Sequence, residues 1–246
     1  MRGIASYPSD FIVSCGIRRV RPEVFLQYFV NQFYYSALFC ETRSRIEFAV
    51  NIIIYSNFMK NQDWVPRDQD KALHVICKEQ LDEIIDDPAT AESTKRALLV
   101  PVLKKFSEAI CQDPEQASRI SLPDGCTLRL PDSLIVLCFL YGVLPEIIIK
   151  ELVDNISVTM LYAIGKPLLD GKNHYMEVFY RITNDLSQST DEPDDLQHEG
   201  YEEMLKELYE QMREELDINI RYNRFRIHFR KWYNSLKHIE IKPIVL

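Results

Sequence analysis

The chain has 246 residues, of which 46% are hydrophobic and 27% are charged, and its formal net charge is −8. A chain of this length can bury a sizeable core without a disulfide or a metal, and seven glycines are few for a β-sandwich or a dinucleotide-binding fold. The composition therefore predicts a mainly α protein: an irregular multi-helix bundle with a long C-terminal helical arm.

The N-terminal segment is expected to be extended, and the first helix should follow it. The apolar run Phe11–Cys15, with the sequence FIVSC, suits a short strand or an extended lead-in. Pro22 fits the first position of a helix because its missing N–H would have no intrahelical partner there. The aromatic-rich run Val24–Cys40 is then the first predicted helix.

Three further helices are predicted in the first half of the chain. Ser44 and Glu47 have the spacing of a capping box, so one helix should run from about Arg45 to Met59. Apolar residues cover nearly every face of this helix, which predicts that the body of the protein surrounds it. The next two helices are expected at about 68–85 and 88–111.

The stretch DSLIVLCFLYGVLPEIIIKELVDNIS, residues 132–157, is an apolar run broken by Gly142 and Pro145. A glycine can take the left-handed backbone that ends a helix and a proline can begin the next, so two helices joined at a corner are expected. A DNA-reading helix needs side chains that reach base edges, but this second helix offers one lysine against three acids. We therefore expect a packed corner, preceded by a loop or small hairpin at 121–131.

The C-terminal part of the chain is divided by an acidic segment that contains proline and glycine. We expect a helical core domain at 1–186, an acidic linker at 187–200 and a C-terminal arm at 201–246. Apolar residues of the arm recur mostly at steps of three and four, which predicts one long helix, although alternation within 218–229 also fits two strands. The apolar stripe should pack onto the core domain or against a second copy of the arm.

Charge is unevenly distributed along the chain. Residues 221–246 carry a net charge of +6 and residues 1–21 carry +3. Because the whole chain carries −8, residues 22–220 carry −17. The end of the arm alternates basic and aromatic residues, a combination that binds phosphate backbones and stacks on bases. Because the aromatics keep helical spacing, the pattern favours the other interpretation, in which they are core residues and the arginines form a solvated face that pairs with the acidic middle of the chain. The candidate binding residues, for a protein or for nucleic acid, are Arg221, Arg224, Arg226, Arg230, Lys231 and Trp232.

Sequence patterns for catalysis or metal binding are weak. The chain has no G-x-S-x-G, Walker loop, dinucleotide fingerprint or H-E-x-x-H motif. Cys15 and Arg21 have the Cys-x5-Arg spacing of a phosphate-binding nucleophilic loop, but the glycine expected three residues after the cysteine is absent, and Ser14 replaces the usual histidine. His74 near Cys77, and His198 beside several glutamates, fit packing and a helix start better than metal ligation. We therefore expect no cofactor and no metal.

The function predicted from the sequence is that of a non-catalytic interaction or regulatory protein, with a protein partner or a second copy bound through the arm. A nucleic-acid-binding regulator that uses the arm is the alternative, and an enzyme of unknown class comes third. Six scattered cysteines and a first segment, MRGIASYPSDF, without an apolar stretch of secretory length predict a cytoplasmic protein. No membrane partner is expected, because the run 134–144 is too short to cross a bilayer.

Overall fold

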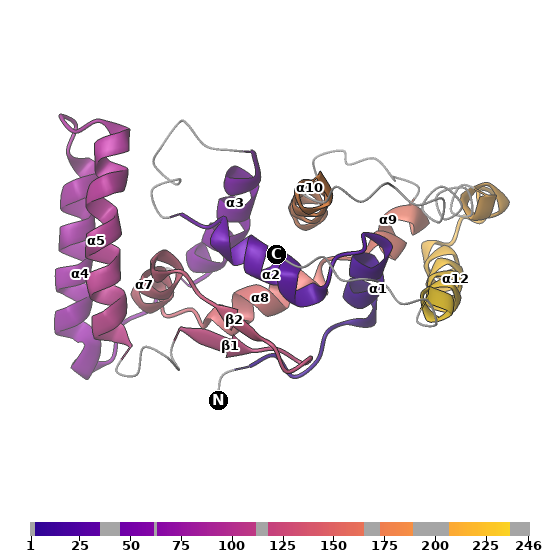
Figure 1. Cartoon of the computed structure of the whole chain (residues 1–246), viewed down its shortest axis with the longest axis horizontal. Helices are drawn as coiled ribbons and strands as arrows, with labels where there is room; N and C mark the ends of the chain where they lie inside the picture. Colours follow the sequence, from indigo (N-terminus) through magenta and orange to yellow (C-terminus); the bar gives the residue numbers. More distant parts are fainter. Residues whose placement is uncertain are drawn as a thin grey trace. The chain divides into compact units, whose positions relative to one another are not determined.

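Figure 1 shows the computed structural model of the whole chain. Within the part described, helices dominate and a small two-stranded hairpin is the sheet that accompanies them, so the predicted mainly α fold class is confirmed. The described residues are 3–34, 45–61, 63–111, 118–164, 173–188 and 207–236.

The chain divides into two compact units, each built from segments that are distant in sequence. Unit 1 comprises Met1–Ser6 and Leu26–Leu152, and unit 2 comprises Tyr7–Phe25 and Val153–Leu246. The helices α2, Pro22–Asn31, and α8, Pro145–Asp154, each contribute residues to both units. The predicted linker at 187–200 is described only at 187–188, the last residues of a helix, so the division into core, linker and arm stays a prediction.

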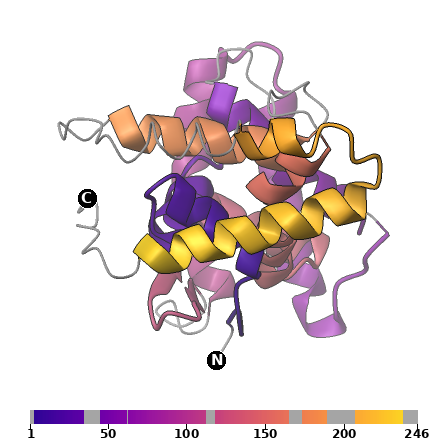
Figure 2. The same cartoon turned by 90° about the vertical axis from the view of Figure 1, so that its right-hand side faces the viewer.

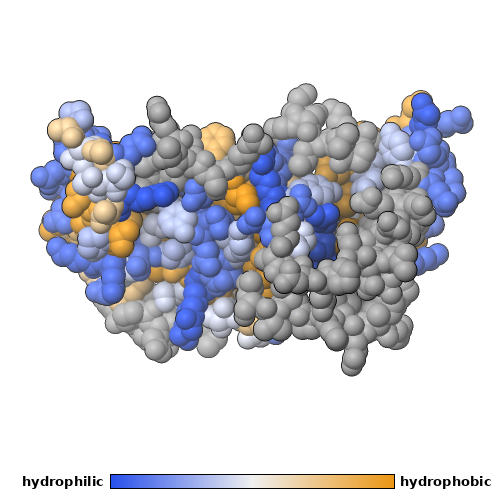
Figure 3. Space-filling view, turned by 45° about the horizontal axis from the view of Figure 1, so that its top comes forward, coloured by the Kyte–Doolittle hydropathy of each residue, from blue (hydrophilic) through white to orange (hydrophobic). Residues whose placement is uncertain are grey.

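Unit 1 is a set of packed helices with a hairpin. Helices α4 and α5 lie side by side, and both contact α7 (Figure 1). Apolar side chains remain exposed on this helical pair, among them Val75 and Val100, and Figure 3 shows such apolar patches between polar ones. Besides its parts of α2 and α8, the unit contains α3 (Arg45–Met59), the short 3-10 helix η2 (Asp68–Asp70), α4 (Lys71–Asp86), α5 (Glu92–Ile110), β1 (Arg119–Ser121), β2 (Thr127–Arg129) and α7 (Asp132–Tyr141).

The hairpin and the corner of unit 1 form where the sequence predicted them. Strands β1 and β2 pair antiparallel with Ile120 opposite Leu128, both buried. Helix α7 ends at Tyr141 and is capped by Gly142, whose φ of 61° is the left-handed conformation that favours glycine, and α8 begins at Pro145. A Cβ at Gly142 would overlap the indole ring of Trp64, so the close approach of this ring also requires a glycine there.

Two predictions for the helices of unit 1 were wrong in part. Helix α3 has the predicted bounds, but the body does not surround it, since Phe48, Tyr55 and Met59 are exposed. Its buried side includes Phe58, whose ring stacks on that of Tyr141 in α7 at a centroid distance of 5.2 Å. The helix predicted at 24–40 ends at Asn31, and residues 35–40 lie outside the described ranges. Ser44 of the expected capping box lies outside them as well.

Unit 2 is a small helical assembly around aromatic side chains. The ring of Phe25 lies 5.9 Å from that of Phe11 and 5.3 Å from that of Phe179, and all three residues are buried. Helix α12 packs on α9 and α1, as Figure 2 shows. Besides its parts of α2 and α8, the described elements are α1 (Ser9–Ile17), α9 (Val158–Ala163), α10 (His174–Gln188), a helical turn at 207–211 and α12 (Ile218–Leu236).

Two predictions for the segments of unit 2 were corrected by the structure. The run Phe11–Cys15 is neither a strand nor an extended lead-in, because it lies inside the helix α1. The described part of the arm, 207–236, is helical rather than a pair of strands, as predicted, but it is not one continuous helix. The helical turn at 207–211 ends before α12 begins, and the carboxylate of Asp217 accepts a hydrogen bond from the backbone N–H of Asn219 at 2.8 Å. This contact is typical of an N-cap, which starts a new helix.

A helix needs about 20 mostly apolar residues to cross a bilayer. None of the described helices is by itself long and apolar enough to cross a membrane. One bent pair, Asp132–Tyr141 followed by Pro145–Ala163, meets the length and composition criteria only when its two parts are taken together.

Candidate functional site

The aromatic side of α12 belongs to the core of unit 2. Phe225 and Phe229 are 0% and 1% exposed, and their rings lie 5.9 and 6.2 Å from the ring of Tyr162 in α9. Of the two coverings predicted for the stripe, packing onto the body of the same chain is therefore observed for these residues. The side chain of Trp232, which was predicted as a binding residue, lies outside the described part.

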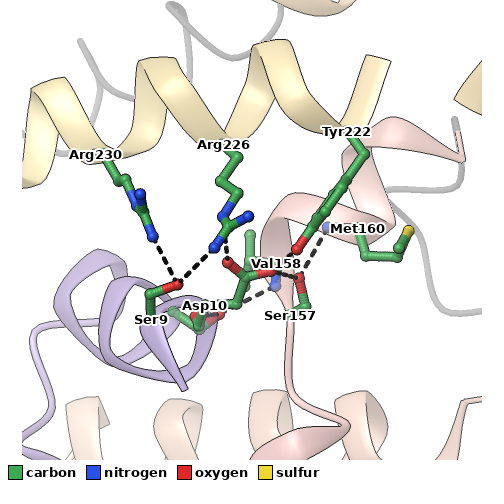
Figure 4. A network of polar contacts seen from close by, with 9 residues as sticks. Ser9, Asp10, Ser157, Val158, Met160, Tyr222, Arg226 and Arg230 are labelled. Carbon is green, nitrogen blue, oxygen red and sulfur yellow. Dashed lines mark hydrogen bonds and ion pairs between the residues drawn. The ribbon is translucent and has the colours of Figure 1, made fainter. Parts of the chain in front are cut away.

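A polar network beside this core joins α12 to α1 and to the start of α9 (Figure 4). At its centre is Asp10, in the first turn of α1, whose side chain is 15% exposed. Its Oδ2 accepts hydrogen bonds from the Ser157 hydroxyl at 2.9 Å and from the Tyr222 hydroxyl. Its Oδ1 lies 3.6 Å from Nε of Arg226. One carboxylate of α1 thus contacts two other segments of the chain, the start of α9 and α12.

The same network caps α9, a helix of only six residues. Ser157 is its N-cap, and its Oγ accepts a hydrogen bond from the backbone N–H of Met160 at 3.0 Å. The N–H of Val158 donates to Oγ of Ser14 at 3.0 Å, and that hydroxyl in turn donates to the backbone carbonyl of Asp10 at 2.7 Å. Such a short helix needs these bonds because its first N–H groups have no intrahelical partners.

The hydroxyl of Ser9 binds two arginines of α12. Nη2 of Arg226 lies 3.3 Å from Oγ of Ser9, and Nη2 of Arg230 lies 3.0 Å from the same atom. Both guanidinium groups therefore point toward the first turn of α1, as Figure 4 shows. A pocket of about 420 Å³ lies against this part of the network, and its lining includes Ser9, Asp10, Asp154, Tyr222 and Arg226.

The network holds unit 2 together and lacks the arrangement of a nucleophilic catalytic site. Burial, the hydrogen bond to Asp10 and the charge of Asp10 raise the pKa of Tyr222 to about 12, so the phenol is protonated at neutral pH. The hydroxyl of Ser157 donates directly to a carboxylate that already accepts a second hydroxyl, and it also accepts the bond that caps α9. An activated serine requires instead a base free to take its proton.

The other sequence candidates for chemistry are packed. Cys15 lies inside α1, and burial, followed by the negative charge of Glu23, raises the pKa of its thiol, which disfavours a thiolate nucleophile. Burial also raises the pKa of Cys77 to about 12, while Nε2 of His74 lies 3.0 Å from the carbonyl oxygen of Leu140. These groups therefore contribute to packing. His198 lies outside the described residues.

The predicted basic residues of α12 occupy different environments. Arg226 and Arg230 face α1 through Ser9, as described above. Arg221 is half-buried, with its guanidinium carbon 5.8 Å from the centre of the Tyr209 ring. Arg224 and Lys231 are exposed. The structure therefore separates residues that the sequence grouped as one patch.

The solvent face of α12 is defined here by Arg224, His228 and Lys231 together with Ile220 and Ile227. The three basic positions are four and three residues apart, so they follow one side of the helix. The two isoleucines are 42% and 53% exposed. The helix sequence, INIRYNRFRIHFRKWYNSL, contains no acidic residue. This face therefore combines positive charge with exposed apolar area.

Sequence reasoning did not identify Ser9, Asp10, Ser157 and Tyr222 as a cluster. The contacts of Asp10 with Ser157 and Tyr222 join residues that are 147 and 212 positions apart in the chain. A serine before a short helical pattern is a local N-cap signal, and it could have identified Ser157 as the start of α9. No local signal joins it to Asp10.

Comparisons of this chain with protein families, with curated proteins and with solved structures found no match. The chain's own residues are therefore the basis for a function. They provide a polar network, hydrogen-bonded within itself, between α1, α9 and α12. They also provide a basic solvent face on the side of α12 that points away from this network.

Proposed function

We propose that this chain is a non-catalytic interaction protein that binds an acidic protein surface through the solvent face of α12. The observation that supports the proposal is the division of α12: Phe225 and Phe229 are buried, while Arg224 and Lys231 are exposed on a helix without acidic residues. The aromatic residues stabilise the fold, which leaves the basic ones for a partner.

The chemistry of this face fits a protein partner with acidic and apolar groups. Arginine and lysine attract a carboxylate surface over a distance and select against basic partners. The exposed Ile220 and Ile227 would add apolar contact area, which supplies affinity that surface charges alone rarely provide. A second copy of the chain is one such partner, because its residues 22–220 are strongly acidic. The total charge is −8, and residues 1–21 and 221–246 contribute +3 and +6, so residues 22–220 carry −17.

Nucleic acid is the alternative partner, and the positive charge of the same face favours it. Stacking on bases, however, requires exposed aromatic rings. Phe225 and Phe229 are buried and do not meet this requirement. Without stacking on these two rings, nucleic acid would be bound mainly through its phosphates, with a strong dependence on salt and little preference for sequence.

The experiment compares the wild-type chain with the double variant Arg224→Glu and Lys231→Glu. The matched control is Lys78→Glu with Lys104→Glu, which makes the same charge change at exposed positions of α4 and α5. Tagged proteins are cross-linked in the native host, purified and analysed by mass spectrometry. Light scattering of the pure proteins reports self-association, and fluorescence anisotropy with labelled polyglutamate and with a DNA duplex reports binding of polyanions.

We expect cross-links between α12 and an acidic protein, in the wild type and in the control but not in the α12 variant. Affinity for polyglutamate should fall by about tenfold or more in that variant, because a change of about 1.4 kcal/mol is tenfold and facing like charges cost several kcal/mol. Equal cross-linking by all three proteins would refute the proposal. Salt-dependent DNA binding that only the α12 variant loses, without a cross-linked protein, would favour the nucleic-acid alternative.

A further inference from the structure

The contact between Ser9 and two arginines is unusual in its charge. A guanidinium group binds most strongly to an anion, whereas Nη2 of Arg226 and of Arg230 both donate to one neutral hydroxyl, at 3.3 and 3.0 Å. Arg226 also has an acidic neighbour, Oδ1 of Asp10 at 3.6 Å. For Arg230, no ion pair with a carboxylate is found among the described residues. Within the described ranges, the exposed guanidinium of Arg230 therefore lies beside Ser9 without a carboxylate bound to it.

The position of Ser9 in its helix adds to this positive environment. Ser9 is the first residue of α1, a helix of nine residues that follows Pro8 and has no side-chain cap at its N-terminus. The backbone N–H groups of a first helical turn carry partial positive charge and favour a phosphate group. The arginine pair is the independent observation, because it reaches Ser9 from a different helix, α12.

We propose that Ser9 is a phosphorylation site and that Arg226 and Arg230 bind the phosphoserine, which strengthens the contact between α1 and α12. A protein kinase would supply the phosphoryl group from a nucleoside triphosphate. The Ser9 oxygen forms a bond to the γ-phosphorus, the bond to the bridging oxygen breaks, and a nucleoside diphosphate leaves, while the hydroxyl proton passes to the kinase's base and then to water. Ser9 is partly exposed and lines the pocket of about 420 Å³, which offers room for the group.

The charges around the site agree with this assignment. A phosphoserine carries a charge of roughly −1.5 to −2 at neutral pH and three acceptor oxygens, enough for both guanidinium groups. The carboxyl groups that line the same pocket belong to Asp10 and Asp154. The carboxylate of Asp10 accepts from Ser157 and Tyr222 and also lies beside Arg226. Because the charge of Arg226 is thus shared with Asp10, the charge that balances the phosphate comes mainly from Arg230. Asp154 opposes the phosphate by repulsion, which makes Arg230 the residue to test.

The test installs phosphoserine at position 9 of the full chain by genetic encoding and compares it with the unmodified protein. The second background is Arg230→Gln, which removes the charge and retains a hydrogen-bonding side chain. The matched control is phosphoserine at Ser93, an exposed residue in the first turn of α5, where a helix N-terminus is present without the arginine pair. Thermal unfolding and the phosphorus NMR titration of the phosphate are measured for each protein at low salt.

We expect phosphorylation of Ser9 to raise the melting temperature by about 2–4 °C, the shift for each kcal/mol in a chain of this size. The gain should fall by half or more in Arg230→Gln. The second pKa of the phosphate should lie below about 6, the usual value, and return toward it in Arg230→Gln, which a purely structural role of Arg230 would not cause. For phosphoserine at position 93, neither the melting temperature nor the pKa of the phosphate should depend on Arg230.

Three results would overturn the proposal. One is an equal phosphate pKa with and without Arg230, together with an unchanged or lower melting temperature. Another is equal stabilisation of the unmodified protein by inorganic phosphate through Arg230, which would mean a ligand site rather than a modification. The third is the absence of a phosphorylated Ser9 peptide in protein isolated from the native host, growing or starved, with phosphatase inhibitors present.

Discussion

Replacing Asp10 by alanine should destabilise unit 2 more than any change on the solvent face of α12. The substitution removes the acceptor of the Ser157 and Tyr222 hydroxyls and the acidic neighbour of Arg226. A hydrogen bond to a charged group contributes about 1.5–3 kcal/mol. The ion pair contributes less than about 1 kcal/mol, because the side chain of Arg226 is 38% exposed. Since the freed hydroxyls line a pocket and can turn to water, the expected loss is about 3 kcal/mol rather than the full sum.

Urea denaturation followed by circular dichroism measures this loss, and thermal unfolding should show a fall of about 6–12 °C. Asp10→Asn retains one carbonyl acceptor and should lose less. The control is Asp82→Ala, at an exposed position of α4, for which a change within about 0.5 kcal/mol is expected. A double-mutant cycle of Asp10→Ala with Tyr222→Phe should show coupling of about 1 kcal/mol. If Asp10→Ala behaves like the control, or the cycle is additive, the assigned network is wrong.

Two further predictions concern a glycine and a tyrosine. Gly142→Ala should lower the free energy of unfolding more than Gly125→Ala, because both glycines have positive φ but only Gly142 would place a Cβ against the ring of Trp64. By urea denaturation we expect a loss of about 1 kcal/mol at Gly125 and of at least about 2 kcal/mol at Gly142. Equal losses would contradict the close approach of the ring. The pKa of Tyr222 is raised to about 12, so the stability it contributes is complete below about pH 10, the ordinary tyrosine pKa, and is lost as the pH rises from about 10 to 12. Tyr222→Phe should therefore flatten the fall of stability in this window, and an identical pH dependence in both proteins would refute the assignment.

The parts of the fold that depend on local backbone chemistry could be predicted from the sequence. Gly142 and Pro145 mark a helix end and a helix start by their own conformational limits, and the corner lies where they predict it. The run Phe11–Cys15 shows the opposite case. A run of five residues with four apolar side chains suits a strand as well as a helix. The decision comes from packing, because Phe11 and Cys15 are one helical turn apart and both are buried. The break before α12 had a local signal in Asp217, which was overlooked because the apolar spacing continues across it.

The candidate site could not be predicted because its residues meet only in the folded chain. Asp10 is the one acid in the basic segment 1–21, and nothing in its neighbourhood indicates contacts with residues 147 and 212 positions away. The basic composition of α12 was visible, but the direction of each side chain was not. Helical spacing identifies which residues share a face, and it does not show which face another helix covers.

This separation of faces decides how the arginines of α12 should be tested. Removing Arg224, Arg226 and Arg230 together would weaken binding to a polyanion under the protein and the nucleic-acid hypotheses alike, and it would also remove the contacts of Arg226 and Arg230 with Ser9. A loss of binding in that triple variant could then arise from a loosened α12. Arg224 and Lys231 can be changed without touching Ser9 or Asp10, and Arg230 can be changed while Arg224 and Lys231 remain on the solvent face. If both partner binding and the effect of phosphoserine respond to Arg230 but not to Arg224, the two proposals describe one surface, and the solvent face is not the binding face.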